Sequence, residues 1–237
     1  VKHFKHRGMG FLVEKEMMFL DNIIRKPNRP LAVILGGAKI KNKLSLIQTL
    51  INKADIIFIG GGMSFTFLRA KGKEIGESLV EKSMLSTAKG IINQARIKGV
   101  KIVFPDDFIC GQSLDDQNPK GSFNVNLFPK KLMGLDIGPN TVKKFISELN
   151  KANTVIWNGP LGLFEIEGYH YGTYKIAKYL SEFNKNGKTV IIGGGDTASA
   201  INQFKLTEKM SHVSTGGGAS LELLSGKRLP ALESLDF

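Results

Sequence analysis

The stretch LAVILGGAKIKNK, residues 31–43, carries the pattern that decides the fold. A continuous run of Leu, Ala, Val and Ile ends in two glycines, and a segment with helical spacing follows. Continuous rather than alternating hydrophobicity predicts a strand that is covered on both faces, as in a parallel sheet. The same pattern recurs along the chain, and the expected strands lie at 31–37, 55–62, 100–107, 154–160, 188–196 and, more weakly, 211–218.

Helical segments alternate with these strands, at 40–52, 83–98, 140–150, 171–184, 197–204 and 219–225. The alternation predicts an α/β fold: a doubly wound, mostly parallel sheet of about six strands with helices on both faces, of the Rossmann-like type. An amphipathic helix at 11–25, stopped by Pro27, precedes the first strand. The irregular stretch 106–138 is too long for a simple connection and predicts a functional loop or a small hairpin.

Composition excludes several classes of protein. The chain has 237 residues, of which 42% are apolar, so it can bury a sizeable core and is not disordered. It has no apolar run long enough to span a membrane, and its basic first ten residues lack the apolar stretch of a signal peptide. Its one cysteine, Cys110, excludes an intrachain disulfide and a cysteine-built zinc site. We expect a cytoplasmic protein that has no membrane partner, with Cys110 as a small buried hydrophobe.

The net charge of +12 is concentrated in the first part of the chain. Residues 1–100 carry eighteen basic and seven acidic side chains. Such asymmetry can indicate nucleic acid. The lysines are scattered singly among Ile and Asn, however, so we expect no nucleic-acid partner and favour an anionic small molecule.

Glycines stand where the expected strands end. In open α/β sheets ligands bind beyond the carboxyl ends of the strands, where glycine lets the backbone approach a ligand and the next helix favours an anion. A tight turn needs glycine anyway, but five such turns in one sheet favour a phosphate-bearing ligand. They are Gly36-Gly37, Gly60–Gly62, Gly159, Gly193–Gly195 and Gly216–Gly218.

The familiar nucleotide motifs fail in detail. The GKT at 187–189 has Glu182 where the first glycine of a phosphate loop belongs. Gly193-x-Gly195-x-x-Ala198 matches a loose dinucleotide motif, but Asp196 would face the pyrophosphate and no acid follows about twenty residues on. A carboxylate beside phosphates is expected where Mg²⁺ lies between them, which favours phosphoryl transfer. The alternative is that Asp196 only caps a helix.

Two lysines follow the first glycine turn. Lys39 and Lys43 are spaced i, i+4, which places both on one face of the opening helical turns, near the expected phosphates. In so lysine-rich a chain, the alternative is an ordinary solvated lysine face.

The motifs together resemble one family. GGAKIKNK, IGGGMSFTFL, GLDIGP, VIWNGPLGLFE, VIIGGGDTASA and SHVSTGGGASLELL, in this order, resemble the C-terminal, nucleotide-binding half of phosphoglycerate kinases. The resemblance runs from about Gly10 to the end of the chain. It implies reversible phosphoryl transfer in glycolysis, in which 1,3-bisphosphoglycerate and ADP give 3-phosphoglycerate and ATP, with Mg²⁺ bound to the nucleotide.

The resemblance also implies roles for individual residues. The adenine slot would be formed by Gly60, Gly61, Gly62, Gly134, Leu135 and Leu163. Glu165 would bind the ribose, Lys43 the nucleotide phosphates with Asn158 beside them, and Lys39 the phosphoryl group in flight. Asp196 would hold Mg²⁺, with Gly194, Gly195 and Thr197 at the phosphates. The acyl-phosphate substrate would face Ser214, Thr215, Gly216, Gly217 and Gly218.

The family has two lobes, and the resemblance covers one. Residues 1–26 would be the interlobe segment and helix, and 27–237 the nucleotide-binding domain with its tail GKRLPALESLDF. The N-terminal lobe that holds 3-phosphoglycerate would lie outside this chain, so we expect the chain to bind Mg-nucleotide without turnover. We also expect a monomer. Two positions depart from the family pattern, Asp106 and Ser225.

Three hypotheses remain at this point: the nucleotide half of a phosphoglycerate kinase, a non-catalytic Mg-nucleotide binding module, and a dinucleotide-dependent oxidoreductase. Asp196 argues against the last. Trp157 and Phe164 are expected in the core, and His212 is expected to be a packed histidine and not a base.

Overall fold

The computed structural model describes residues 6–227 and 229–235. Its strands are β1 (Leu31–Leu35), β2 (Ile56–Ile59), β3 (Lys101–Val103), β4 (Asp107–Gly111), β5 (Gly121–Asn124), β6 (Met133–Ile137), β7 (Thr154–Asn158), β8 (Thr189–Gly193) and β9 (His212–Val213). Its helices are α1 (Phe11–Arg25), α2 (Leu44–Leu50), α3 (Met63–Ala70), α4 (Leu85–Ile97), α5 (Pro139–Leu149), α6 (Tyr171–Leu180), α7 (Gly195–Gln203), α8 (Gly217–Leu224) and α9 (Pro230–Glu233).

The main sheet has six parallel strands in the order β3-β2-β1-β7-β8-β9. The strand order reverses between β1 and β7, as in other doubly wound sheets. Leu35 pairs with Ile59 on one side and with Asn158 on the other, so these three strands end at one level. The predicted α/β class and the six expected strands are confirmed.

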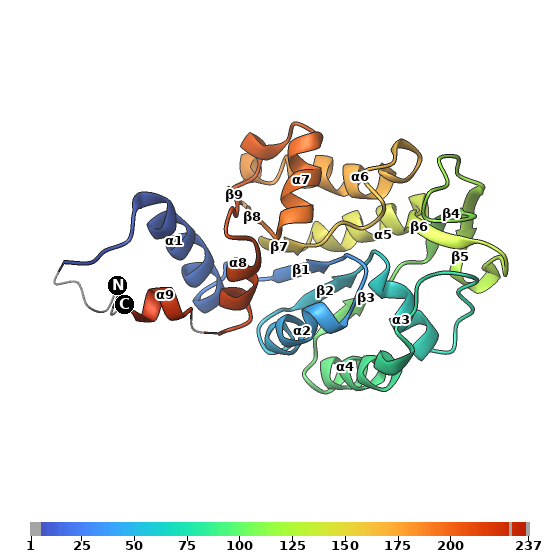
Figure 1. Cartoon of the computed structure of the whole chain (residues 1–237), viewed down its shortest axis with the longest axis horizontal. Helices are drawn as coiled ribbons and strands as arrows, with labels where there is room; N and C mark the ends of the chain where they lie inside the picture. Colours follow the sequence, from blue (N-terminus) through green and yellow to red (C-terminus); the bar gives the residue numbers. More distant parts are fainter. Residues whose placement is uncertain (1–5, 228, 236–237) are drawn as a thin grey trace.

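Helices cover both faces of this sheet (Figure 1). On one face α5, α6 and α7 pack on a core that contains Phe58, Phe145 and Trp157. On the other face α2, α3 and α4 pack on Leu35, with Ile47 in the same cluster. Burial on both faces is the reason why the strands read as continuous apolar runs. Trp157 and Phe164 are buried, as expected.

Two parts of the fold differ from the sequence-based expectations. The stretch 106–138 contributes a three-stranded antiparallel sheet, β5-β4-β6, where a functional loop or a small hairpin was expected. Helix α3 was not expected at all. Nearly every side chain of α3 is buried, so its sequence shows no polar stripe by which a helix is recognised.

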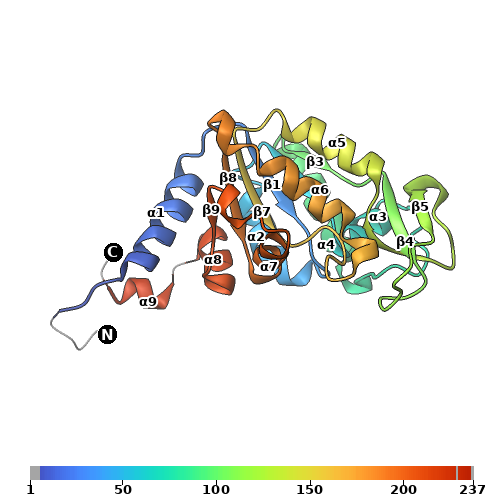
Figure 2. The same cartoon turned by 90° about the horizontal axis from the view of Figure 1, so that it is seen from above.

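Helix α1 lies outside the sheet, against α8 and beyond the edge strand β9 (Figure 2). It ends at Arg25, just before Pro27, as the sequence predicts. Of the expected interlobe segment 1–26, residues 1–5 lie outside the described residues, as do 228, 236 and 237 of the tail. Among the helices of the described part, none combines the length and apolar character needed to cross a membrane.

Candidate functional site

The turns after β1, β2 and β7 are hydrogen-bonded to one another at the carboxyl edge of the sheet. The backbone N–H of Gly37 donates to Pro160 O at 2.8 Å, and the N–H of Met63 donates to Gly37 O at 2.9 Å. Gly61 has a φ of +60°, and a Cβ there would lie 2.6 Å from Gly37 N. Close approach of backbone to backbone is therefore what these glycines provide.

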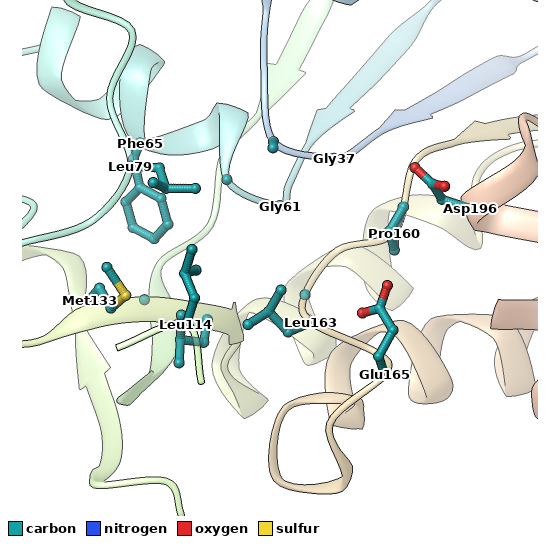
Figure 3. Close-up of a pocket in the computed structure, with 15 residues that line it drawn as sticks. Gly37, Gly61, Phe65, Leu79, Leu114, Met133, Pro160, Leu163, Glu165 and Asp196 are labelled. Carbon is teal, nitrogen blue, oxygen red and sulfur yellow. The ribbon is translucent and has the colours of Figure 1, made fainter. Parts of the chain in front are cut away.

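A cavity of about 190 Å³ lies against these turns. Figure 3 shows that it has two unlike ends. Apolar side chains gather at one end, and the carboxylates of Glu165 and Asp196 stand at the other. The apolar end is formed by Phe65, Leu79, Leu114, Met133, Leu135 and Leu163. A ligand with a flat apolar part and a polar or metal-bound part fits this division.

Many of the residues proposed for the nucleotide line this cavity. They are Gly61, Gly62, Gly134, Leu135, Leu163, Glu165 and Asp196. Gly60 does not, because it is buried against Leu161: a Cβ at Gly60 would lie 2.3 Å from Leu161 Cδ2. Gly60 therefore serves the packing behind the turn and does not face the cavity.

The structure adds residues that sequence reasoning missed. Phe65 is on α3, Leu79 follows it in an irregular segment, Leu114 is in the loop after β4, and Met133 begins β6. Only Phe65 had a usable signal, because it lies three residues after the Gly60–Gly62 turn. The other three are single apolar residues in segments whose position depends on the small antiparallel sheet.

Lys43 and Asn158 meet beside the cavity. The ammonium group of Lys43 donates to Asn158 Oδ1, and Asn158 Nδ2 donates to Gly193 O at 2.7 Å. Burial lowers the pKa of Lys43 to about 8, although the attraction of Asp196 acts in the opposite direction. Lys43 also lies next to the cavity wall, since a Cβ at Gly37 would be 3.4 Å from its Cε. A cation is thus held between β1, β7 and β8.

Lys39 is placed differently from the expectation. It is exposed and lies before the first helical turn, which begins at Lys41, so a shared helical face does not relate it to Lys43. The loop is held instead by Glu81, whose Oε2 accepts from the backbone N–H groups of Ile40 at 2.7 Å and Lys41 at 3.3 Å.

The turn after β8 combines an open backbone with one exposed carboxylate. Gly194 has a φ of +87°, and a Cβ there would meet Asn158 Nδ2 at 2.6 Å, whereas nothing lies near Gly195. Asp196 is exposed in the first turn of α7, and Gly194, not Asp196, is the N-cap residue. The alternative reading of Asp196 as a capping residue is therefore wrong.

Thr197 is fully buried, and its hydroxyl accepts from Gly159 N–H at 2.6 Å. In this structure the hydroxyl braces the turn after β7 and does not face the cavity. Its expected place on the phosphates stays a prediction.

The residues expected at the acyl phosphate lie elsewhere on the same edge of the sheet. Thr215, Gly216 and Gly217 follow β9 and lead into α8, and none of them lines the first cavity. Thr215 and Gly216 line a separate cavity of about 520 Å³ between α1, α8 and α9. Behind them the hydroxyls of Ser214 and Ser220 are 2.5 Å apart.

His212 is packed, as expected. It is buried, it stacks on Phe19 of α1 with 4.7 Å between the ring centroids, and its Nε2 is 3.2 Å from Glu16 Oε2. Glu16 Oε1 in turn accepts from Thr215 N–H at 2.7 Å. This contact explains how α1 is attached to the turn after β9.

No group of three or more His, Cys, Asp or Glu side chains able to hold a metal ion occurs among the described residues. Asp196 is a single carboxylate at an open glycine turn. One carboxylate is enough to hold Mg²⁺ when the phosphate oxygens of a substrate and water molecules supply the remaining ligands.

The fold and the site together define an α/β protein with a cavity, the candidate ligand site, at the carboxyl edge of a doubly wound parallel sheet. A family model described as phosphoglycerate kinase matches residues 1–227. The chain belongs to the phosphoglycerate kinase family.

Individual relatives agree with this assignment. The chain is 47% identical over 227 residues to a phosphoglycerate kinase of Fervidobacterium nodosum. The matched stretch covers 95% of this chain and 57% of that protein. It is similar to the solved phosphoglycerate kinase of Coxiella burnetii, with a TM-score of 0.89 and 38% identity over 94% of this chain and 57% of that one. A Pyrococcus horikoshii phosphoglycerate kinase structure matches at 28% identity and a TM-score of 0.76, over 96% of this chain and 57% of that one. The chain therefore spans little more than half the length of these relatives.

Proposed function

We propose that this chain is the C-terminal, nucleotide-binding half of a phosphoglycerate kinase. In that enzyme a phosphoryl group passes between 1,3-bisphosphoglycerate and ADP, in glycolysis. The observation that carries the proposal is the two-ended cavity: apolar side chains line one end, Glu165 and Asp196 stand at the other, and Lys43 lies behind Gly37 in the cavity wall.

The apolar end is the proposed adenine slot. A flat base between Gly61, Gly134 and the side chains of Leu114 and Leu163 would bury its faces without needing a charged partner. Glu165, exposed at the rim, is then in place to accept hydrogen bonds from ribose hydroxyls.

The polar end is the proposed phosphate side. Mg²⁺ supplies positive charge between nucleotide oxygens and a carboxylate, and Asp196 is the carboxylate that fits. Lys43 would move its hydrogen bonds from Asn158 toward the phosphates, and Gly194 and Gly195 offer backbone N–H groups. Because phosphoryl transfer needs positioning and charge neutralisation more than a protein nucleophile, this set of residues suits the reaction.

Lys39, Thr215, Gly216 and Gly217 are proposed to serve the phosphoryl group itself. Lys39 is exposed, and the N–H groups at the start of α8 lie on the same edge of the sheet. The 3-phosphoglycerate body would be held by residues outside this chain. We therefore expect nucleotide binding but negligible turnover from the 237 residues alone, because positioning both reactants can lower a barrier by about 7–11 kcal/mol.

Calorimetric titration of the chain with Mg-ADP tests the proposal. We expect saturable binding with one site, weaker binding when Mg²⁺ is chelated, and no comparable binding of NAD. A folded sample that binds no adenine nucleotide contradicts the proposal. Conversion of ATP and 3-phosphoglycerate by this chain alone would show that the acid-binding site had been placed wrongly. A chain that binds Mg-ADP but stays inactive when it is joined to a family N-terminal lobe would favour the non-catalytic binding module.

A further inference from the structure

We propose that the chain carries a second anion site, in which Lys71, Lys73 and Lys144 bind a small phosphate-bearing molecule. These residues surround a pocket of about 370 Å³, called here the lysine pocket. It shares no lining residue with the nucleotide cavity. The two lie toward opposite ends of α3, because Phe65 lines the nucleotide cavity and Leu68 lines the lysine pocket.

The charges around the lysine pocket do not balance. Four lysines and two carboxylates line it. Glu148 pairs with Lys101 at 2.8 Å, and Asp106 pairs with Lys144 at 2.7 Å. In the described part of the chain neither Lys71 nor Lys73 forms an ion pair with a carboxylate. Two positive charges are therefore left over.

The other contacts of these two lysines are with uncharged groups. Lys73 Nζ donates to the amide oxygen of Asn126 at 2.7 Å, and Lys71 Nζ lies 4.5 Å above the ring of Phe104. An amide and an aromatic face orient an ammonium group but do not neutralise it. Both groups stay available to an anion.

The ammonium groups act on one common space. Burial, and then repulsion by Lys73 and Lys144, hold the pKa of Lys71 below its ordinary value, with Asp106 acting in the opposite direction. Like charges that are gathered in a concave site raise the free energy of the empty protein, and a bound dianion removes that cost. Asp106, which departs from the family pattern, lines this pocket.

Hydrogen bonds fix the backbone that carries Lys71 and Lys73. Gly72, with a φ of +79°, lies two residues after the end of α3, and the N–H of Lys73 then donates back to Leu68 O at 3.0 Å. This is the glycine-terminated helix end that fixes the direction of the following residue. The N–H of Lys71 donates to Phe67 O at 3.0 Å. A binding site that is already ordered loses less entropy when its ligand binds.

The chemistry indicates a phosphate bound to a small organic body. Lysine ammonium groups bind phosphate as point charges, and two unneutralised lysines match the nearly double negative charge of a phosphate monoester better than the single charge of a carboxylate. Leu68, Ile102 and Phe104 provide an apolar wall beside them. The competing explanation is that Lys71 and Lys73 only offset the partial negative charge at the carboxyl end of α3.

The test is an NMR titration of the full 237-residue chain, without Mg²⁺ and at constant ionic strength. The probes are inorganic phosphate, pyrophosphate and glycerol 2-phosphate, and the amide signals of Lys73, Asp106 and Asn126 report on the lysine pocket. Three changes are compared: Lys71→Met with Lys73→Met, Asp106→Asn, and the control Lys89→Met on the exposed face of α4. Thermal unfolding of each variant shows whether it is folded.

We expect saturable shifts at the lysine pocket for all three probes. The double lysine change should weaken this binding by at least about fivefold, and Asp106→Asn should strengthen it by about threefold, because it removes a competing carboxylate. Lys89→Met should change nothing. A glycerol 2-phosphate affinity above that of inorganic phosphate assigns an organic phosphate, and the reverse assigns free phosphate.

Two results overturn the proposal. In the first, shifts are confined to the glycine turns near residues 36–43 and 193–197, which would be anion binding at the nucleotide site only. In the second, the double change lowers thermal stability but leaves the anion affinity of the pocket unaltered. The two lysines would then only offset the partial negative charge at the carboxyl end of α3. Neither result depends on whether the chain binds nucleotide.

Discussion

The carboxylate of Glu16 holds Thr215 by two hydrogen bonds. Its Oε1 accepts from the backbone N–H of Thr215 at 2.7 Å and from the hydroxyl at 3.1 Å. The two residues are 199 positions apart, so this contact joins α1 to the turn after β9. Burial acts to raise the pKa of Glu16, but the hydrogen bonds from Thr215 and the nearby polar groups of Ser214 and His212 outweigh it and hold that pKa below 4.5.

The Glu16 contact should therefore be sensitive to acid. A carboxylate whose folded pKa is lowered adds stability that is present above its unfolded pKa, near 4.5, and is lost as the pH falls through the folded pKa. The Thr215 amide NMR signal should move as the pH is lowered below that value. In Glu16→Gln this movement should disappear, whereas Glu14→Gln, an exposed change on the same helix, should keep it. An unchanged titration in Glu16→Gln would disprove the assignment.

Asp196→Asn should reduce the part of ADP affinity that depends on Mg²⁺. The change removes the negative charge that a hard cation prefers, and metal-free binding should hold or improve because carboxylate–phosphate repulsion is lost. Stability without ligand should change little, since the side chain caps no helix. ADP affinity is measured with Mg²⁺ and with chelator, and Glu208→Gln, an exposed change of the same charge, is the control. A Mg²⁺ enhancement that survives Asp196→Asn would remove this aspartate from the metal site.

Lys43 should make ADP binding depend on pH. Because its pKa is lowered to about 8, the ammonium form that attracts phosphate is lost above that pH, and affinity should fall as the pH rises from about 7 to 9. Lys43→Met should weaken binding with or without Mg²⁺ and abolish this pH dependence.

Raising the pH, which should weaken ADP binding through Lys43, should increase the stability of the folded protein through the same side chain. A lysine whose folded pKa is lowered opposes folding while it is charged, so the free energy of unfolding should rise between about pH 8 and 10.5. Denaturant titration should show this rise in the wild type and in Lys39→Met, which changes an exposed lysine, and not in Lys43→Met. Equal pH profiles for all three proteins would contradict the burial of Lys43.

Leu114→Ala should weaken ADP binding and leave the unfolding free energy nearly unchanged. Leu114 lines the apolar end of the cavity, and its side chain is 42% exposed in the empty protein, so the loss falls on the ligand. We expect an effect of about 1 kcal/mol, or roughly fivefold in affinity. Leu127→Ala, at an 80% exposed leucine outside the cavity, should have no effect. Equal affinities for the two variants would show that the base does not occupy the apolar end.

Glu81→Ala should loosen the loop that carries Lys39. Two backbone N–H groups, of Ile40 and Lys41, would lose their acceptor, at a cost of about 1–3 kcal/mol. Faster hydrogen exchange at these two amides, with little change in the strands, is the expected signature. Glu81→Gln retains an acceptor oxygen and should restore protection. Exchange that is as slow in Glu81→Ala as in the wild type would mean that the loop is held by other contacts.

The sequence predicts the parts of the fold that depend on local chemistry. The six parallel strands follow from continuous apolar runs, because a strand covered on both faces has no polar alternation. Helix α3 was not predicted, for a related reason: a helix that is buried almost all round has no polar stripe. The strands of the small sheet are short and partly exposed, so 121–124 and 133–137 carry no comparable run.

The candidate site divides in the same way. The glycine turns and Asp196 could be found because they directly follow apolar runs, and parallel strands bring such turns to one edge. Leu79 and Leu114 could not be found, because their distance from Gly61 depends on how the antiparallel sheet packs beside α3. The helical-face argument for Lys39 and Lys43 was wrong because a hydrogen-bonded loop, held by Glu81, precedes the first helical turn.

By itself, then, the sequence determined the α/β class, the parallel sheet and the edge of the sheet at which the candidate site lies. These depend on patterns within about ten residues, where hydrophobic burial and backbone freedom act locally. Only the tertiary structure decided which distant groups come together: Lys43 with Asn158, Glu16 with Thr215, and Lys71 with Lys144 around one pocket. Such contacts follow from the packing of whole elements against one another, and the spacing of residues along the chain does not encode their distances.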